Sequence, residues 1–105
     1  MENRVPGGDV NPYLAISAII AGGLHGIENE LPLPERFTGN AYEAGVDHLP
    51  TTLREAAKLF SESTIARAAF GDDVVEHYLN QARIEVEAYD AAVTDWERIR
   101  GFERL

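Results

Sequence analysis

The chain has 105 residues, of which 45% are hydrophobic and 26% charged, and its formal net charge at neutral pH is −9. This composition argues against disorder as the overall state, and the length corresponds to about one small domain with a modest core. So acidic a surface does not attract a nucleic-acid backbone or an anionic membrane, and we expect neither as a partner.

The chain contains no cysteine, which excludes disulfides and thiolate metal sites. The longest uncharged apolar run, residues 12–24, is shorter than the roughly 20 residues that span a bilayer. No basic leader or small-residue cleavage site of a secretory signal accompanies it. We therefore expect a soluble, cytoplasmic protein.

The N-terminal segment joins a polar start to the most hydrophobic part of the chain. Because the residue before a proline favours extended geometry, we expect Arg4 and Val5 to end a strand and residues 6–9 to form a turn. Asn11 is typical of a helix N-cap and Pro12 of a first helical residue. The helix that follows is apolar nearly all round, so we expect it to be buried and covered on more than one side. A charged start directly before such a helix indicates a piece of a longer chain.

The middle of the chain alternates a loop with short helices. Residues 28–50 are rich in proline and glycine and predict a loop of about 20 residues, a length at which loops are usually functional or lie on another surface. Thr52 and Glu55 have the spacing of a capping box, which opens a helix. Ser63 begins a further short helix, and Gly71 is suited to end it with a left-handed conformation.

Two helices complete the pattern. Residues 73–91 carry apolar side chains at spacings of three and four with a charged opposite face, and Asp72 is a candidate cap. Thr94 and Glu97 form a second capping box before a terminal helix whose apolar face ends at Leu105. The fold class predicted is mainly α, about five helices after a short N-terminal extended segment.

Few residues are candidates for chemistry. His25, His48 and His77 lie too far apart for a local metal-binding pair, and we interpret each as structural or as a surface residue. Glu2 and Arg4 are different, because side chains two residues apart on an extended segment project to the same side. A glutamate can ligate Mg²⁺ and an arginine can bind a carboxylate or phosphate in bidentate fashion. The alternative is an ordinary surface ion pair.

Two stretches resemble the glutamine synthetase family. Residues 2–14 read ENRVPGGDVNPYL and residues 21–29 read AGGLHGIEN, and the similarity extends through residues 39–42, 49–50 and 94–98. The resemblance covers essentially the whole chain. It implies that residues 1–105 are the C-terminal helical portion of a larger α+β catalytic domain, and not a complete domain.

Members of that family join glutamate to ammonia with ATP through γ-glutamyl phosphate, at sites between neighbouring subunits of a ring homo-oligomer. The resemblance implies the same ligase chemistry for the full-length enzyme, with Mg²⁺ or Mn²⁺ as cofactor and glutamate, ATP and ammonia or another amine as substrates. It implies that Glu2 ligates an active-site cation and that Arg4 contacts the glutamate substrate. A metal ion and a guanidinium there would neutralise charge on the transferring phosphoryl group.

The resemblance also leaves alternatives open. Tyr42 falls where some bacterial members carry an adenylylated tyrosine, but residues 43–46 lack the acidic and proline-rich sequence that follows it there, so Tyr42 is named only as a candidate modification position. The family's other metal ligands and its nucleotide-binding residues lie upstream, and we expect this chain alone to be inactive. The alternative functions are a γ-glutamylpolyamine or other γ-glutamylamine synthetase, and a non-catalytic helical module for interaction or oligomerisation.

Overall fold

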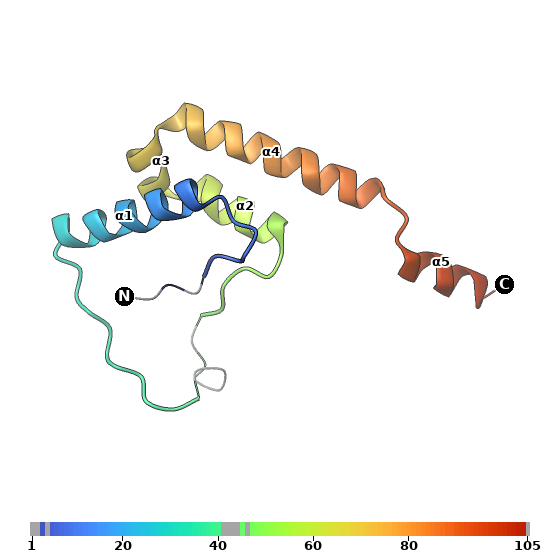
Figure 1. Ribbon diagram of the computed structural model, residues 1–105, viewed down its shortest axis with the longest axis horizontal. Coiled ribbons are helices and arrows are strands. Elements are labelled where there is room, and N and C mark those ends of the chain that lie inside the picture. Colours follow the sequence, from blue (N-terminus) through green and yellow to red (C-terminus); the bar gives the residue numbers. More distant parts are fainter. Residues whose placement is uncertain (1–2, 4, 41–44, 46, 105) are drawn as a thin grey trace. The chain divides into compact units, whose positions relative to one another are not determined.

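A computed structural model describes residues 3, 5–40, 45 and 47–104, and this part of the chain is mainly helical, as predicted (Figure 1). The helices are α1 (Pro12–Glu28), α2 (Leu53–Glu62), α3 (Thr64–Phe70), α4 (Asp72–Ala91) and α5 (Asp95–Phe102). The described residues contain no strand. The strand end expected at Val5 is therefore wrong for that residue, and Arg4 lies outside the described residues.

The helices belong to two compact units. One comprises Met1–Leu49 and Ser63–Gly71 and contains α1 and α3; the other comprises Pro50–Glu62 and Asp72–Leu105 and contains α2, α4 and α5. Within them α1 contacts α3, and α2 contacts α4. None of the helices in the described ranges combines the length and the apolar character that a membrane span requires.

Helix α1 begins as the sequence predicts. The Asn11 side-chain oxygen accepts hydrogen bonds from the backbone N–H groups of Tyr13, at 3.0 Å, and Leu14, at 3.4 Å. Pro12 occupies the first helical position, where a missing N–H costs nothing. A turn is present one residue later than the predicted residues 6–9, since the Val10 N–H donates to the Gly7 carbonyl at 3.3 Å. Local hydrogen bonds thus fix the entry of the chain into α1.

The expected burial of α1 is wrong for the described chain. None of its residues is buried, and five large side chains follow one another along one face of the helix. We call this face the α1 stripe; its members and exposed fractions are Tyr13 (83%), Ile16 (56%), Ile20 (56%), Leu24 (52%) and Ile27 (76%). Full burial of one such side chain contributes about 1.5–3 kcal/mol. In the described chain, therefore, most of the stabilisation that burial of these side chains would contribute is absent.

Helix α2 begins with the predicted capping residues, but Glu55 accepts its main hydrogen bonds from a different residue than predicted. The Thr52 hydroxyl oxygen accepts from the Glu55 N–H at 3.2 Å, as expected of an N-cap. The Glu55 carboxylate, however, accepts from the backbone N–H of Thr51 at 2.9 Å and from its hydroxyl at 3.2 Å. The principal partner of Glu55 is thus one residue before the cap, because Thr51 supplies two donors there.

Glu55 gives the start of α2 a dependence on pH. The backbone N–H and then the hydroxyl of Thr51 hold the pKa of Glu55 below its ordinary value of 4.5. Because the pKa is lower in the folded state, ionised Glu55 contributes stability above about pH 4.5, and this contribution is lost as the pH falls through the folded-state pKa. We expect an NMR titration to show the Thr51 amide and the Glu55 carboxylate titrating together with a midpoint below 4.5.

The control for this titration is Glu55→Gln, which should leave the Thr51 amide shift flat over the same pH range. A Glu55 midpoint at or above 4.5 would contradict the prediction.

Helix α3 begins and ends as predicted. The Ser63 hydroxyl oxygen accepts from the Ala66 N–H at 3.1 Å. Gly71 ends the helix with φ 82°, and its N–H donates to the Arg67 carbonyl at 2.9 Å. A positive φ is disfavoured for side chains with a Cβ, so glycine suits this position. These caps fix a helix too short to be stable by propensity alone.

Helix α4 carries the one fully buried side chain of the described residues, Val75. The helix begins at Asp72, so this residue is the first of the helix and not the cap predicted for it. The Arg54 guanidinium of α2 lies 2.6 Å from the Asp90 carboxylate of α4. Both side chains are more than half exposed, so the pair orients the two helices and contributes little stability.

Helix α5 confirms the second capping box. The Thr94 hydroxyl oxygen accepts from the Glu97 N–H at 3.4 Å, and the Glu97 carboxylate accepts from the Thr94 N–H at 2.8 Å. The Arg100 guanidinium lies 5.2 Å from the centre of the Trp96 ring. The expected end of the apolar face at Leu105 lies outside the described residues.

Candidate functional site

The residues predicted to carry chemistry, Glu2, Arg4 and Tyr42, lie outside the described residues. Their roles therefore stay predictions. The structure does describe the chain that links the first two to α1. Beside them, the Asn3 side-chain oxygen accepts from the Val5 N–H at 3.0 Å. This local bond takes the place of the strand ladder that the sequence led us to expect at Val5.

The link between Arg4 and α1 is short. Residues 5–10 separate Arg4 from the Asn11 cap, and the turn over residues 7–10 shortens their reach further. Six residues span at most about 20 Å even when fully extended.

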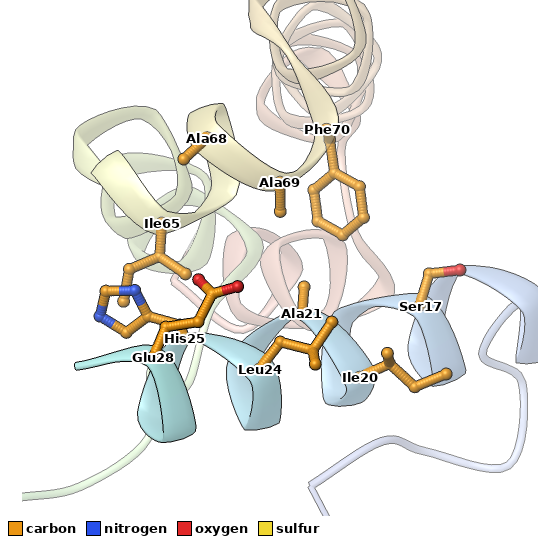
Figure 2. Close-up of a pocket in the computed structure, with 10 residues that line it drawn as sticks. All are labelled: Ser17, Ile20, Ala21, Leu24, His25, Glu28, Ile65, Ala68, Ala69 and Phe70. Atoms are coloured by element: carbon orange, nitrogen blue, oxygen red, sulfur yellow. The ribbon is translucent and has the colours of Figure 1, made fainter. Parts of the chain in front are cut away.

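Helices α1 and α3 enclose a cleft of about 430 Å³ (Figure 2). Its walls are mainly apolar, with Ile20 and Leu24 from α1 and Ile65 and Phe70 from α3. Figure 2 shows Ile65 and Phe70 projecting from α3 toward α1. The spacing within residues 64–70 indicates an apolar face but does not indicate which helix that face meets, so these residues could not be assigned to a cleft from the sequence.

The polar groups of the cleft make local contacts. The Ser17 hydroxyl donates to the Tyr13 carbonyl at 2.7 Å. The Asn29 side-chain nitrogen donates to the His25 carbonyl at 2.8 Å and lies 3.2 Å from His25 Nδ1. Together with Glu28, these groups place one carboxylate and one imidazole beside an apolar recess. Such an arrangement is suited to receiving apolar side chains, and no serine and histidine of this cleft form a nucleophile and base pair.

The second unit holds a groove of about 540 Å³ beside α2 and α4. It is lined by Thr52, Leu53, Arg54, Glu85, Val86, Tyr89 and Asp90. Because Arg54 pairs with Asp90 at 2.6 Å, Glu85 is the remaining charge of this lining. A groove without a remaining cation is poorly suited to phosphate.

The described residues do not form a metal site. Within residues 3, 5–40, 45 and 47–104, no three or more histidine, aspartate or glutamate side chains gather closely enough to hold an ion. A glutamate such as Glu2 is nevertheless the kind of hard oxygen donor that Mg²⁺ or Mn²⁺ takes. The donor chemistry of Glu2 thus fits one ligand of such a cation.

Comparison with known proteins identifies the family. The family model for the catalytic domain of glutamine synthetase matches residues 1–100. The chain is 65% identical over 104 residues to a gamma-glutamylethanolamide synthetase of Streptomyces coelicolor, covering 99% of this chain and 22% of the relative. It is 42% identical over 103 residues to a glutamate–isopropylamine ligase of a Pseudomonas species, covering 95% of this chain and 22% of the relative.

A third relative is more distant. A glutamine synthetase of Staphylococcus aureus is 36% identical over 96 residues, covering 84% of this chain and 22% of the relative. The chain thus spans about a fifth of the length of the curated relatives it matches. Since the family model matches nearly every residue, the chain belongs to the glutamine synthetase family, within its catalytic domain.

Proposed function

We propose that the chain is part of an ATP-dependent ligase that joins the γ-carboxylate of glutamate to a small primary amine. The choice of amine is supported by the sequence identities to three relatives, ranked from highest to lowest. Identity is 65% to a relative named for an ethanolamide product, 42% to one named for isopropylamine and 36% to a glutamine synthetase. This order favours an alkylamine such as ethanolamine over ammonia.

The proposed reaction has two steps. The γ-carboxylate of glutamate attacks the terminal phosphorus of ATP, giving γ-glutamyl phosphate and ADP. The amine nitrogen then attacks the acyl carbon, loses a proton and expels inorganic phosphate, leaving the amide. Negative charge concentrates on the carboxylate and phosphoryl oxygens in both steps, so fixed positive charge beside them lowers the barrier.

Two residues of this chain have proposed roles in that reaction. The Arg4 guanidinium binds the glutamate substrate and its phosphorylated form, holding the acyl group in place through paired hydrogen bonds. Glu2 supplies one oxygen ligand to Mg²⁺ or Mn²⁺, which when bound offsets charge on the phosphate groups. The remaining ligands and the nucleotide site belong to upstream parts of the full-length enzyme, and the chain alone is inactive.

A chimera tests the proposed function. In it, this chain replaces the matching segment of the Streptomyces coelicolor relative, to which it is 65% identical. We expect the chimera to make γ-glutamylethanolamide from glutamate, ethanolamine and ATP at a rate within roughly tenfold of the parent enzyme, because the substituted segment supplies the same contacts. Product is measured by mass spectrometry and phosphate release, with ammonia, isopropylamine and putrescine as competing amines and the chain alone as blank.

A folded chimera without ligase activity would overturn the proposal. It would favour the alternative of a non-catalytic helical module, which the exposed α1 stripe also fits. A folded chimera that prefers putrescine where the parent enzyme prefers ethanolamine would replace the ethanolamine assignment with a γ-glutamylpolyamine synthetase.

A further inference from the structure

We propose that the groove beside α2 and α4 binds a small organic cation, a primary alkylammonium ion, with the Glu85 carboxylate as its counter-ion. All the lining residues belong to the unit that comprises Pro50–Glu62 and Asp72–Leu105, so the groove lies within one compact unit. Its volume of about 540 Å³ falls within the range of small-molecule sites. The inference goes beyond the proposed ligase reaction and does not rest on it, because binding is measured on the chain itself.

The charges of the groove decide the sign of the ligand. Arg54 supplies the positive charge of the lining, and its guanidinium lies 2.6 Å from the Asp90 carboxylate. The Glu85 side chain, in contrast, forms no ion pair or hydrogen bond with any other residue that the structure describes. An ionised carboxylate is an acceptor with no proton to donate, so it pairs with a cationic donor. The net charge of −9 adds a field that draws cations toward the chain and repels anions.

The apolar part of the lining decides the class of cation. Glu85 and Tyr89 are four residues apart on α4 and therefore share a face of the helix, with Leu53 contributed by α2. The Tyr89 side chain is 71% exposed and Leu53 50% exposed, so both are free to contact a ligand. An aromatic ring attracts an ammonium group that lies over its face, and an alkyl chain removes water from the leucine and valine side chains.

A bare metal ion fits the groove less well than an ammonium ion. In the described ranges of the chain, no three histidine, aspartate or glutamate side chains lie close enough together to hold a metal. An ammonium group needs only hydrogen-bond acceptors, and one carboxylate beside a tyrosine ring supplies an acceptor and a π face. The groove thus suits an ion with a charged head and a short apolar chain.

An NMR titration of the 15N-labelled chain with n-butylammonium chloride, at neutral pH and constant ionic strength, tests the inference. We expect saturable shifts of the amides of residues 52–54 and 85–90, with a Kd of roughly 1–20 mM, because each contact is weak at an exposed site. n-Butanol has the same length without the charge and should bind at least about threefold more weakly. This comparison needs no substitution, so it keeps the test decisive if a variant fails to fold.

Two substitutions separate the parts of the site. Glu85→Gln keeps the size of the side chain and removes its charge, and it should weaken n-butylammonium binding about threefold to fivefold, the upper end for an exposed ion pair. Tyr89→Leu keeps an apolar side chain and removes the ring, and it should weaken binding about twofold to fivefold. The matched control is Glu62→Gln at the exposed end of α2, whose Kd should stay within about 1.5-fold of the unsubstituted chain.

Each of four results would overturn the inference. The first is a set of shifts that rises linearly without saturation, and the second is saturable shifts confined to residues outside the groove. The third is equal affinity for n-butanol and n-butylammonium, which would make the groove an apolar surface without charge selection. The fourth is an unchanged Kd in Glu85→Gln, which would remove Glu85 as the counter-ion.

Discussion

Replacing Arg4 with alanine in the chimera should lower kcat/KM for glutamate by roughly 100-fold to 1,000-fold, the range seen when one preorganised hydrogen-bond donor is removed from a developing oxyanion. The loss follows from the proposed role of the guanidinium, which binds the substrate carboxylate and the oxygens of the acyl phosphate through two parallel hydrogen bonds. Arg4→Lys keeps the charge without the planar fork and should fall between the alanine variant and the unsubstituted chimera. The measurement is steady-state phosphate release at saturating ATP.

Arg83→Ala is the matched control for the arginine variant. The Arg83 guanidinium pairs with Glu87 at 2.7 Å on the exposed face of α4, an arrangement that contributes little to stability. This control should change kcat/KM by less than about twofold, as expected of a substitution on an exposed helix face. Near-normal turnover of Arg4→Ala would remove Arg4 from the active site.

Replacing Glu2 with glutamine should raise the Mg²⁺ concentration required for half-maximal activity. The amide oxygen is neutral, so the metal ion loses a charged ligand while the side chain keeps its size. We expect a shift of at least roughly 10-fold to 100-fold, the cost of losing even a second-shell partner of a metal ligand. Activity should recover in part at high Mg²⁺, which separates a ligand from a residue needed only for folding.

The control for Glu2 is Glu62→Gln, which removes a carboxylate from the exposed end of α2. Its Mg²⁺ dependence should match that of the unsubstituted chimera. If Glu2→Gln gave the same curve as this control, Glu2 would not be a metal ligand.

The local features of the fold were predictable because they depend on residues close together in sequence. The caps at Asn11, Ser63 and Thr94 and the stop at Gly71 each rest on a side chain or a backbone preference within three residues of the helix end. The prediction for the Glu55 carboxylate was wrong by one residue, because Thr51 and not Thr52 is its main hydrogen-bond donor.

Contacts between distant residues were not predictable in the same way. Apolar spacing indicates that α1 needs a cover, but it does not say that α3 supplies only part of it. The cleft formed by Leu24 and Phe70 depends on a contact across more than forty residues, for which the sequence pattern holds no direct signal.

At the candidate site, residue spacing and family resemblance support different interpretations. The side chains of Glu2 and Arg4 suit a metal ion and an anion on elementary grounds, yet spacing alone favours an ordinary surface ion pair. The family pattern around them favours the catalytic interpretation, and that family is confirmed by the match over residues 1–100. The substitutions of Glu2 and Arg4 described above test the role of each side chain.

The capped junction at Asn11 has a thermodynamic consequence for the proposed enzyme. Residues 5–10 connect Arg4, for which we propose a role in binding glutamate, to α1, and the Asn11 side-chain oxygen caps that helix at 3.0 Å from the Tyr13 nitrogen. In the proposed enzyme, a ligand that binds only the folded form stabilises that form. Saturating glutamate and ATP would raise the melting temperature of the chimera, and a weakened cap would loosen substrate binding without touching the substrate.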